Sequence, residues 1–477
     1  MNRISINSRI PILAIVTASI FFVANAQSVF PVSMEQQFDS LIVAGLAKSG
    51  VPSVSVAIVK NGRVVYAKAF GDARLDPKMS ATPEMRYSIG SISKQFTATA
   101  ILLLQEEGKL SIDDYVGKYF PDLTRANEVT IREILSHTSG YQDYWPEDYV
   151  MKPMLQPVTA QQIMDTWGKK PLDFDPGTKW QYSNTNFVIA GAIVEKVAGE
   201  PLLQFLREKV FTPLEMKSVT NTDEHKLGDT DPTGYLRYAL GPLRPAPKEG
   251  RGWLFAAGEL AMTARDLALW DISVINRKIL QPQSYNQLET EVLLKNGVGS
   301  HYALGIGVGM QTGRRVLSHD GEVSGFTADN ILFPDDSVAI VALTNQDAAS
   351  GAGIIVRSIV PLLFAVEDSS TAHKTDVARS IFEGLQHGTI DRSLFTDNTN
   401  NYFNDEALKD FAASLSPFGP PKEFTQVAQN LRGGMTLHRY RITFETKTPG
   451  FAHRTLVAWT YEMPDGKLEQ YQVAEQN

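Results

Sequence analysis

The sequence predicts a two-domain α/β (α+β) protein. Its larger part is an antiparallel sheet flanked by helices with an inserted all-helical subdomain, and a small C-terminal α+β domain follows. Strand-like alternation occurs at both ends of residues 27–365, and a helix-rich stretch lies between them. Beyond residue 365, a polar stretch shows neither the helical nor the strand-like spacing of apolar residues. A new set of helices and strands follows it. The chain has 477 residues, which is long enough for more than one hydrophobic core.

Composition excludes several classes of function. The 45 Lys and Arg residues face 53 Asp and Glu residues, a net charge of −8. This balance offers no general electrostatic footprint for nucleic acid, so no nucleic-acid partner is expected. Cysteine is absent, which excludes disulfides, zinc-thiolate sites and a cysteine nucleophile. The chemistry must therefore come from other residue types.

Residues 1–26 have the pattern of a secretory signal peptide. Arg3 and Arg9 precede an apolar stretch over residues 10–23, and Ala24 and Ala26 supply small residues for cleavage. The stretch is shorter than the ~20 residues that cross a bilayer. We expect cleavage after Ala26, a periplasmic or secreted protein, and no stable membrane span after cleavage. An uncleaved N-terminal anchor is the alternative.

The first elements after this segment are a hairpin and a buried helix. Residues 53–59 alternate in polarity, residues 64–66 are strand-forming Val-Val-Tyr, and Asn61-Gly62 between them supplies the positive φ angles of a tight hairpin turn. From Ser91 the apolar period becomes helical and stops at Gly108.

The helical middle is marked by capping boxes, and strands return after it. Thr130 and Thr159 are each followed three residues later by Glu or Gln, a pattern that satisfies free backbone donors at a helix start. Further helices are expected after Asn184 and Thr263. The later signals predict strands at 302–308, 326–333 and 337–343, then a helix at 354–364. One sheet built from distant pieces of chain would accommodate this order.

Residues 366–371 are predicted to be a linker, and residues 372–477 a small α+β domain of unknown role. Helical patterns occur near 377–385 and 407–414, and strand patterns at 440–444, 456–461 and 468–473.

Two groups of residues could together supply a serine nucleophile and the groups that activate it. Ser91 and Lys94 lie three residues apart on one helical face, where a lysine can activate a hydroxyl near the positive end of a helix. Tyr182-Ser183-Asn184 adds a phenol that can share a proton with a nearby amine. Taken alone, each group is better explained by a plain structural role: a capping serine with a solvated lysine, or a packed tyrosine with an N-cap asparagine.

A third group is His319-Asp320-Gly321. Glycine in or beside a strand permits close approach of a ligand. His319 could donate a hydrogen bond to a substrate oxygen, and the amide of Glu322 could form an oxyanion hole with the amide of Ser91. An ordinary turn between strands is the alternative for this group alone.

Taken in order, the three groups resemble the signature of the serine β-lactamase and penicillin-binding protein superfamily. The tyrosine form of the second motif is similar to the class C β-lactamase branch, which includes D-aminopeptidases, D,D-peptidases and esterases. Supporting segments occur across residues 27–365, at 134–140, 180–184, 213–216 and 256–267.

The resemblance implies a β-lactamase/transpeptidase-like fold and a serine acyl-enzyme. It makes Ser91 the nucleophile, Lys94 the residue that helps to activate it, and Tyr182 the general base and proton shuttle. Under the same resemblance no metal and no organic cofactor is needed.

The resemblance also implies four substrate-binding residues, Asn184, His319, Gly321 and Glu322. His319 and Gly321 would belong to the edge-strand motif that faces the substrate. Class C β-lactamases usually carry lysine at the position of His319, and an unperturbed histidine has a pKa of ~6.5 and no constant charge at neutral pH. Glu322 adds a negative group, so an anionic substrate is disfavoured.

Two further features lie near these motifs in the sequence, a histidine and a group of aromatic residues. His137 lies in a segment, 137–140, that the resemblance assigns to a structural turn. The aromatic residues Tyr141, Tyr144, Trp145 and Tyr149 either line a substrate cleft or form a packed loop.

The sequence therefore predicts an exported serine hydrolase of D-amino-acid-peptide or esterase type, which acts on amide or ester bonds of a small-molecule or peptide substrate. Cell wall is one candidate source of that substrate. A β-lactamase or D,D-carboxypeptidase is one alternative. Another alternative is a penicillin-recognising sensor or binding protein that is acylated but does not release the product.

Overall fold

A computed structural model describes residues 32–147, 149–364, 369–445 and 454–475. The chain forms two compact units, Met1–Leu363 and Phe364–Asn477. The predicted signal peptide and residues 365–368 lie outside the described residues. Helix α10 (Ser369–Gln386) begins within the predicted linker, because Ser and Thr are favoured where helices start.

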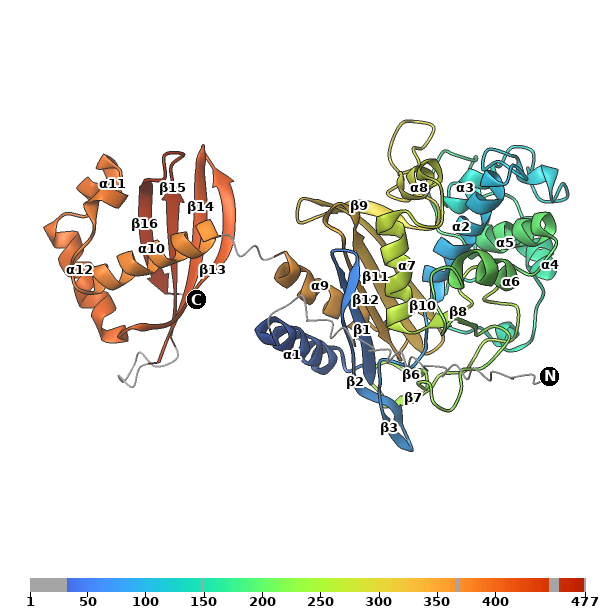
Figure 1. Ribbon diagram of the computed structural model, residues 1–477, viewed down its shortest axis with the longest axis horizontal. Coiled ribbons are helices and arrows are strands. Elements are labelled where there is room, and N and C mark those ends of the chain that lie inside the picture. The colour runs from blue at the N-terminus through green and yellow to red at the C-terminus, as the bar shows by residue number, and fades with distance from the viewer. Residues whose placement is uncertain (1–31, 148, 365–368, 446–453, 476–477) are drawn as a thin grey trace, which may run out of the picture. The chain divides into compact units, whose positions relative to one another are not determined.

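The first unit is built on a seven-stranded antiparallel sheet with the order β3-β2-β1-β12-β11-β10-β9. Strands from the two ends of the unit lie side by side, since β1 pairs with β12 along its length (Figure 1). The strands are β1 (Ser53–Lys60), β2 (Arg63–Leu75), β3 (Lys78–Ser80), β9 (Gly307–Gln311), β10 (Arg314–Val323), β11 (Phe326–Phe333) and β12 (Val338–Thr344). This arrangement confirms the predicted sheet of distant pieces. The turn between β1 and β2 has positive φ at Asn61 (52°) and Gly62 (67°), as the sequence predicts.

Helices flank this sheet. Helix α9 (Gly351–Leu363) packs on β11 and β12 and against α1 (Val32–Ser49), whereas α7 (Ala264–Asn276) packs on β1, β2 and β12. Figure 1 shows α1 and α9 on one side of the sheet and α7 with the helical region on the other.

The inserted helical region lies between β3 and β9 in sequence. Its helices are α2 (Ser93–Glu106), α3 (Ile131–Leu135), α4 (Ala160–Ile163), α5 (Asn184–Ala198), α6 (Leu202–Leu206) and α8 (Pro282–Glu289). Both predicted capping boxes form, at Thr130 and at Thr159. Short strands complete it: β4 (Tyr87–Ser88), β5 (Thr220–Asn221), β6 (Tyr235–Arg237), β7 (Leu243–Pro245) and β8 (Leu260–Met262).

Two local predictions in this unit were wrong. The strand expected at 302–308 begins only at Gly307, because Gly305 turns the chain (φ 75°) and lies so close to α2 that a Cβ there would sit 2.8 Å from the carbonyl oxygen of Lys94. The helix expected from Ser91 begins as a 3-10 turn, η1 (Gly90–Ile92), and α2 starts at Ser93.

The second unit is a four-stranded antiparallel sheet in the order β13-β14-β15-β16, with helices packed on one face. Its strands are β13 (Pro421–Arg432), β14 (Met435–Phe444), β15 (Thr455–Glu462) and β16 (Leu468–Glu475), and its helices α10, α11 (Asp397–Tyr402) and α12 (Asp405–Leu415). Strand β13 was not predicted, because most of its residues are exposed and the alternation is weak. In the part of the chain that the structure describes, no helix has the length and apolarity needed to span a membrane.

Candidate active site

Ser91 stands on the 3-10 turn η1, which two glycines bring against strand β10. Gly90 has φ of 51°, and a Cβ on it would lie 2.6 Å from the amide nitrogen of Glu322. A Cβ on Gly321 would overlap the carbonyl oxygen of Ile89. Only glycine permits this approach, so the backbones of η1 and β10 meet directly beside the half-buried Ser91.

Lys94 lies one turn further on and is completely buried. Its Nζ is 3.0 Å from Ser91 Oγ, 2.8 Å from Asn184 Oδ1 and 2.8 Å from the carbonyl oxygen of Ala257. Burial lowers the pKa of Lys94 from 10.5 to about 7, although the negative charge of Asp143 acts in the opposite direction. At neutral pH a substantial fraction of Lys94 is therefore an uncharged amine beside the serine.

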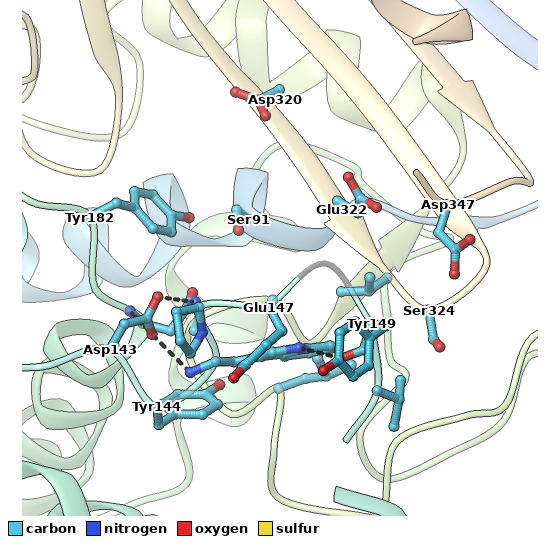
Figure 2. Close-up of a pocket in the computed structure, with 18 of the residues that line it drawn as sticks. Ser91, Asp143, Tyr144, Glu147, Tyr149, Tyr182, Asp320, Glu322, Ser324 and Asp347 are labelled. Carbon is cyan, nitrogen blue, oxygen red and sulfur yellow. Dashed lines mark hydrogen bonds between the residues drawn. The ribbon is translucent and has the colours of Figure 1, made fainter. Parts of the chain in front are cut away.

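Tyr182 completes the group that the sequence predicted. Its ring centroid lies 4.9 Å from Lys94 Nζ, and Figure 2 shows its hydroxyl directed toward Ser91. Burial raises the pKa of Tyr182 far above its ordinary value of 10.0, and the nearby Ser91 side chain offsets this only in part. The phenol consequently holds its proton before substrate arrives, which favours Lys94 over Tyr182, the base that the resemblance implies, for the first proton transfer.

Asn184 begins helix α5 and is held by Asp143, a residue that sequence reasoning missed. The backbone amide of Asn184 donates to Asp143 Oδ1 (2.9 Å), and its side-chain amide donates to Oδ2 (3.3 Å). With its Oδ1 accepting from Lys94, Asn184 is thereby tied to both the lysine and the aspartate. Burial raises the pKa of Asp143, which also accepts from the amide of Trp145. The sequence carries no spacing signal for Asp143, because it precedes its partner by 41 residues.

His319 lies in the site with both ring nitrogens engaged. Nδ1 is 2.5 Å from the carbonyl oxygen of Asp320, and Nε2 is 2.6 Å from the hydroxyl of Tyr302. A carbonyl only accepts, so Nδ1 carries the proton and the hydroxyl of Tyr302 donates to Nε2. Burial, reinforced by the charge of Lys94, lowers the pKa of His319 to about 4. The residue is neutral at physiological pH and its hydrogen bonds go to the protein.

The third motif is not on the edge strand of the sheet, which corrects that prediction. It lies on β10, and β9 is the edge. However, β9 pairs only with residues 314–318 of β10. The following residues of β10 extend past β9 and face η1, which gives the motif the open position that the resemblance implies. The side chain of Glu322 is exposed, and its Oε1 accepts from the amide of Ala348 (2.7 Å).

One cleft of about 720 Å³ is lined by Ser91, Tyr182, Asn184, His319 and Glu322, whereas Lys94 lies buried behind Ser91 (Figure 2). Five carboxylates line the cleft: Asp143, Glu147, Asp320, Glu322 and Asp347. Among the lining residues that the structure describes there is no lysine or arginine. Figure 2 shows Asp320 and Glu322 along β10, with Asp143 and Glu147 across the cleft. The open space is therefore electrostatically negative.

The aromatic residues at 141–149 divide between the two roles that the sequence left open, the lining of a cleft and the packing of a loop. Tyr144, Trp145 and Tyr149 line the cleft. Tyr141 does not line it; its ring is buried and its hydroxyl donates to the carbonyl of Thr124 (3.1 Å). Within the described ranges, no group of three or more His, Cys, Asp or Glu side chains is placed to hold a metal ion.

A family model described as Beta-lactamase matches residues 38–356. This range contains η1, α5 and β10, the elements that position the three motifs. The chain belongs to the Beta-lactamase family. The fold described above is the β-lactamase/transpeptidase-like one that the sequence predicted.

Individual relatives agree with this membership. Protein flp of Staphylococcus aureus (strain MW2) is 30% identical over 326 residues, which cover 66% of this chain and 64% of that protein. A D-aminopeptidase of Brucella anthropi is 27% identical over 342 residues, covering 71% of this chain and 64% of the relative. The chain thus spans about 64% of the length of these curated relatives. The structure of a D-stereospecific amidohydrolase from Streptomyces sp. has 25% identity and a TM-score of 0.59, covering 68% of this chain and 97% of that one.

Proposed function

We propose that this member of the Beta-lactamase family is an exported serine hydrolase that cleaves amide or ester bonds through an acyl-enzyme on Ser91. The observation that carries the proposal is the buried Lys94 amine at 3.0 Å from Ser91 Oγ, with the hydroxyl of Tyr182 directed toward the same serine. The two other contacts of the Lys94 amine, with Asn184 and Ala257, are to acceptor oxygens. An uncharged amine donates its two hydrogens to these oxygens and directs its lone pair at the serine hydroxyl.

In the reaction, Ser91 Oγ forms a bond to the substrate carbonyl carbon while its proton moves to Lys94. The resulting oxyanion is stabilised by the amides of Ser91 and Glu322. The bond to the leaving nitrogen or oxygen then breaks, and the leaving group takes a proton from the hydroxyl of Tyr182, which is replenished from Lys94. Water next attacks the acyl carbon and gives a proton to Lys94. The bond between this carbon and Ser91 Oγ then breaks, and Oγ takes the proton back from Lys94, which releases the acid and free Ser91.

The charge of the cleft favours a substrate that is neutral or cationic at the end nearest β10. His319 is neutral, and the lining residues include Asp320, Glu322 and Asp347. A substrate carboxylate there would meet like charge, whereas a free amino group would meet opposite charge. Similarity to a D-aminopeptidase and a D-stereospecific amidohydrolase supports small amides or peptides with a D-residue on the acyl side. A fragment derived from cell wall would suit this cleft if its end nearest β10 carries an amide or an amine in place of a free carboxylate.

Export follows from the signal pattern of residues 1–26. Expression with the native leader in a bacterial host should yield a mature chain that begins at Gln27 and is recovered outside the cytoplasm. Intact mass of the exported protein checks this, and a full-length chain retained in the membrane would contradict it.

The function is tested by intact-protein mass spectrometry and product release. Wild type and Ser91→Ala are mixed separately with a fluorophosphonate, a penicillin, a p-nitrophenyl ester, and the D and L forms of an amino-acid p-nitroanilide. We expect a wild-type-only fluorophosphonate adduct, turnover of the ester and the D-anilide, and weak reaction with penicillin.

Each other outcome has a distinct meaning. Rapid penicillin hydrolysis would identify a β-lactamase, and a lasting penicillin adduct without turnover would identify a sensor. Failure of every probe to modify wild type at Ser91 would refute the acyl-enzyme proposal.

A further inference from the structure

His137 lies next to the catalytic group, and the reaction described above does not use it. Its side chain is completely buried. Its backbone has φ of 60°, a left-handed conformation in which His, Asn and Asp are the enriched side-chain types. A buried polar ring in such a conformation calls for an explanation.

Three contacts connect His137 to the segment that carries Tyr182. The carbonyl oxygen of His137 accepts from the amide of Gln181 (3.0 Å), and its Nδ1 accepts from the amide of Ser183 (3.2 Å). Its ring lies against that of Tyr182, with centroids 4.3 Å apart. One residue therefore holds the backbone on both sides of Tyr182 and supports the ring between them.

The hydrogen bond from Ser183 also determines the tautomer. A backbone N–H can only donate, so Nδ1 keeps its lone pair and Nε2 carries the proton in the neutral ring. Nε2 is buried and has no hydrogen-bond partner among the described residues. Burial, together with the nearby Lys94 and His319, holds the pKa of His137 well below 6.5, so the ring remains neutral.

The other face of His137 reaches the third motif. Its ring centroid lies 4.9 Å from that of Tyr302, the residue whose hydroxyl donates to His319. Phe187 of α5 packs at 5.3 Å. The titratable groups around the ring are thus Lys94 on α2, Tyr182, Tyr302 and His319, and none of them is a carboxylate.

We propose that His137 is a positioning residue for Tyr182: its neutral ring, acting as a hydrogen-bond acceptor through Nδ1, sets the place of the phenol relative to Ser91. The inference rests on the proposed function, because it assigns His137 a part in that reaction. His137 touches no reacting atom. It acts by keeping the phenol within reach of the serine proton and of the leaving group, where displacement by ~1 Å can cost ~100-fold in rate.

Two substitutions separate this role from general packing. His137→Asn retains an acceptor atom near the position of Nδ1 and suits the left-handed backbone, whereas His137→Ala has no acceptor. Both lose the ring. We expect kcat for the ester to fall ~100-fold in His137→Ala and to recover at least tenfold in His137→Asn, with KM changed less than about threefold in both. The matched controls are His301→Ala and His301→Asn, at an exposed histidine with φ of 56°, and neither should alter kcat.

Thermal unfolding of all variants shows how much of each effect is stability. Equal kcat in wild type, His137→Ala and His137→Asn, with only the melting temperature lowered, would overturn the proposal. So would an equal loss of kcat in both variants, because the acceptor would then be irrelevant.

The tautomer of His137 can also be measured in a variant that lacks the nucleophile. This experiment tests the role of His137 independently of the proposed function. In Ser91→Ala, nitrogen-15 NMR of the histidine rings should show a neutral ring with an unprotonated Nδ1 from pH 5 to 8 that is lost when His137→Asn is added, whereas the signal of the buried His438, whose Nε2 faces Glu462, should stay. An imidazolium or the opposite tautomer at His137 would refute the inference even if wild type hydrolyses every substrate. Conversely, the expected tautomer together with no Ser91-dependent turnover would refute the proposed function alone.

Discussion

Lys94 shows at the scale of one residue how burial creates reactivity. An exposed lysine carries a charge up to pH ~10 and cannot accept a proton from serine. Complete burial brings its pKa to about 7, and two fixed oxygens orient the amine. The same side chain on the surface would have no catalytic value.

Replacing Lys94 should therefore remove most of the chemistry. In Lys94→Met, which is similar in size, we expect the rate of fluorophosphonate addition to Ser91 to fall ~10³-fold, within the range for loss of a general base. Timed intact-mass measurements give this rate. Comparable labelling of Lys94→Met and wild type would show that another group activates the serine.

The pH dependence follows from the same pKa. Because the uncharged amine is the active form and the pKa of Lys94 is about 7, the acylation rate of wild type should rise as pH increases from 5.5 to 7 and level off above about 8. Stopped-flow measurement with a neutral ester gives the profile. A rate that is flat across this window would contradict the assignment of Lys94 as the base.

At the scale of elements, the site depends on the close approach of β10 to η1. Gly321 permits this approach, since a side chain would overlap the carbonyl of Ile89. Gly321→Ala should displace β10 from Ser91 and lower kcat/KM for the ester at least ~100-fold. Gly309→Ala on β9 is the control, because a Cβ there meets only a Val316 side-chain atom, at 3.7 Å. Full activity of Gly321→Ala would show that the two elements need not touch.

Glu259 joins two other elements behind the site. It lies directly before β8, is 3% exposed, and accepts from the side-chain amide of Asn221 on β5 (2.9 Å). Burial raises its pKa from 4.5 to about 8. Between these values the folded state binds more protons at Glu259 than the unfolded state does, so this residue makes the protein less stable as pH rises.

Glu259→Gln removes that dependence because glutamine is always neutral. Relative to wild type, the free energy of unfolding of the variant should be similar at pH 4.5 and higher by at least ~1 kcal/mol at pH 8. Urea titrations at the two pH values measure it, with the exposed Glu84→Gln as control. A variant that is equally destabilised at both pH values would show that the carboxylate is needed as an anion.

At the scale of the whole molecule, the candidate site belongs to one unit. Ser91, Lys94, Tyr182 and His319 all lie within Met1–Leu363. A protein of residues 27–364 should fold and react with the fluorophosphonate at a rate within about threefold of the full chain, since compact domains fold on their own. An unfolded or unreactive product would show that the second unit is required.

From the sequence alone, the candidate site residues and most of the elements could be predicted. The three motifs and the capping boxes are local, and their spacing predicts which side chains share a helix face or a turn. For that reason Ser91 and Lys94 were identified together, and the hairpin at Asn61-Gly62 was placed correctly. The family follows from the order of these motifs along the chain.

Tertiary structure alone decided the partners and the protonation states. Asp143 and Tyr302 were missed because they meet Asn184 and His319 only through folding of separate segments. The orientation of His319 toward the protein, and the neutral form of Lys94, depend on how completely each side chain is removed from water. Burial and long-range contact are properties of the packed chain, and no local pattern of residues encodes them.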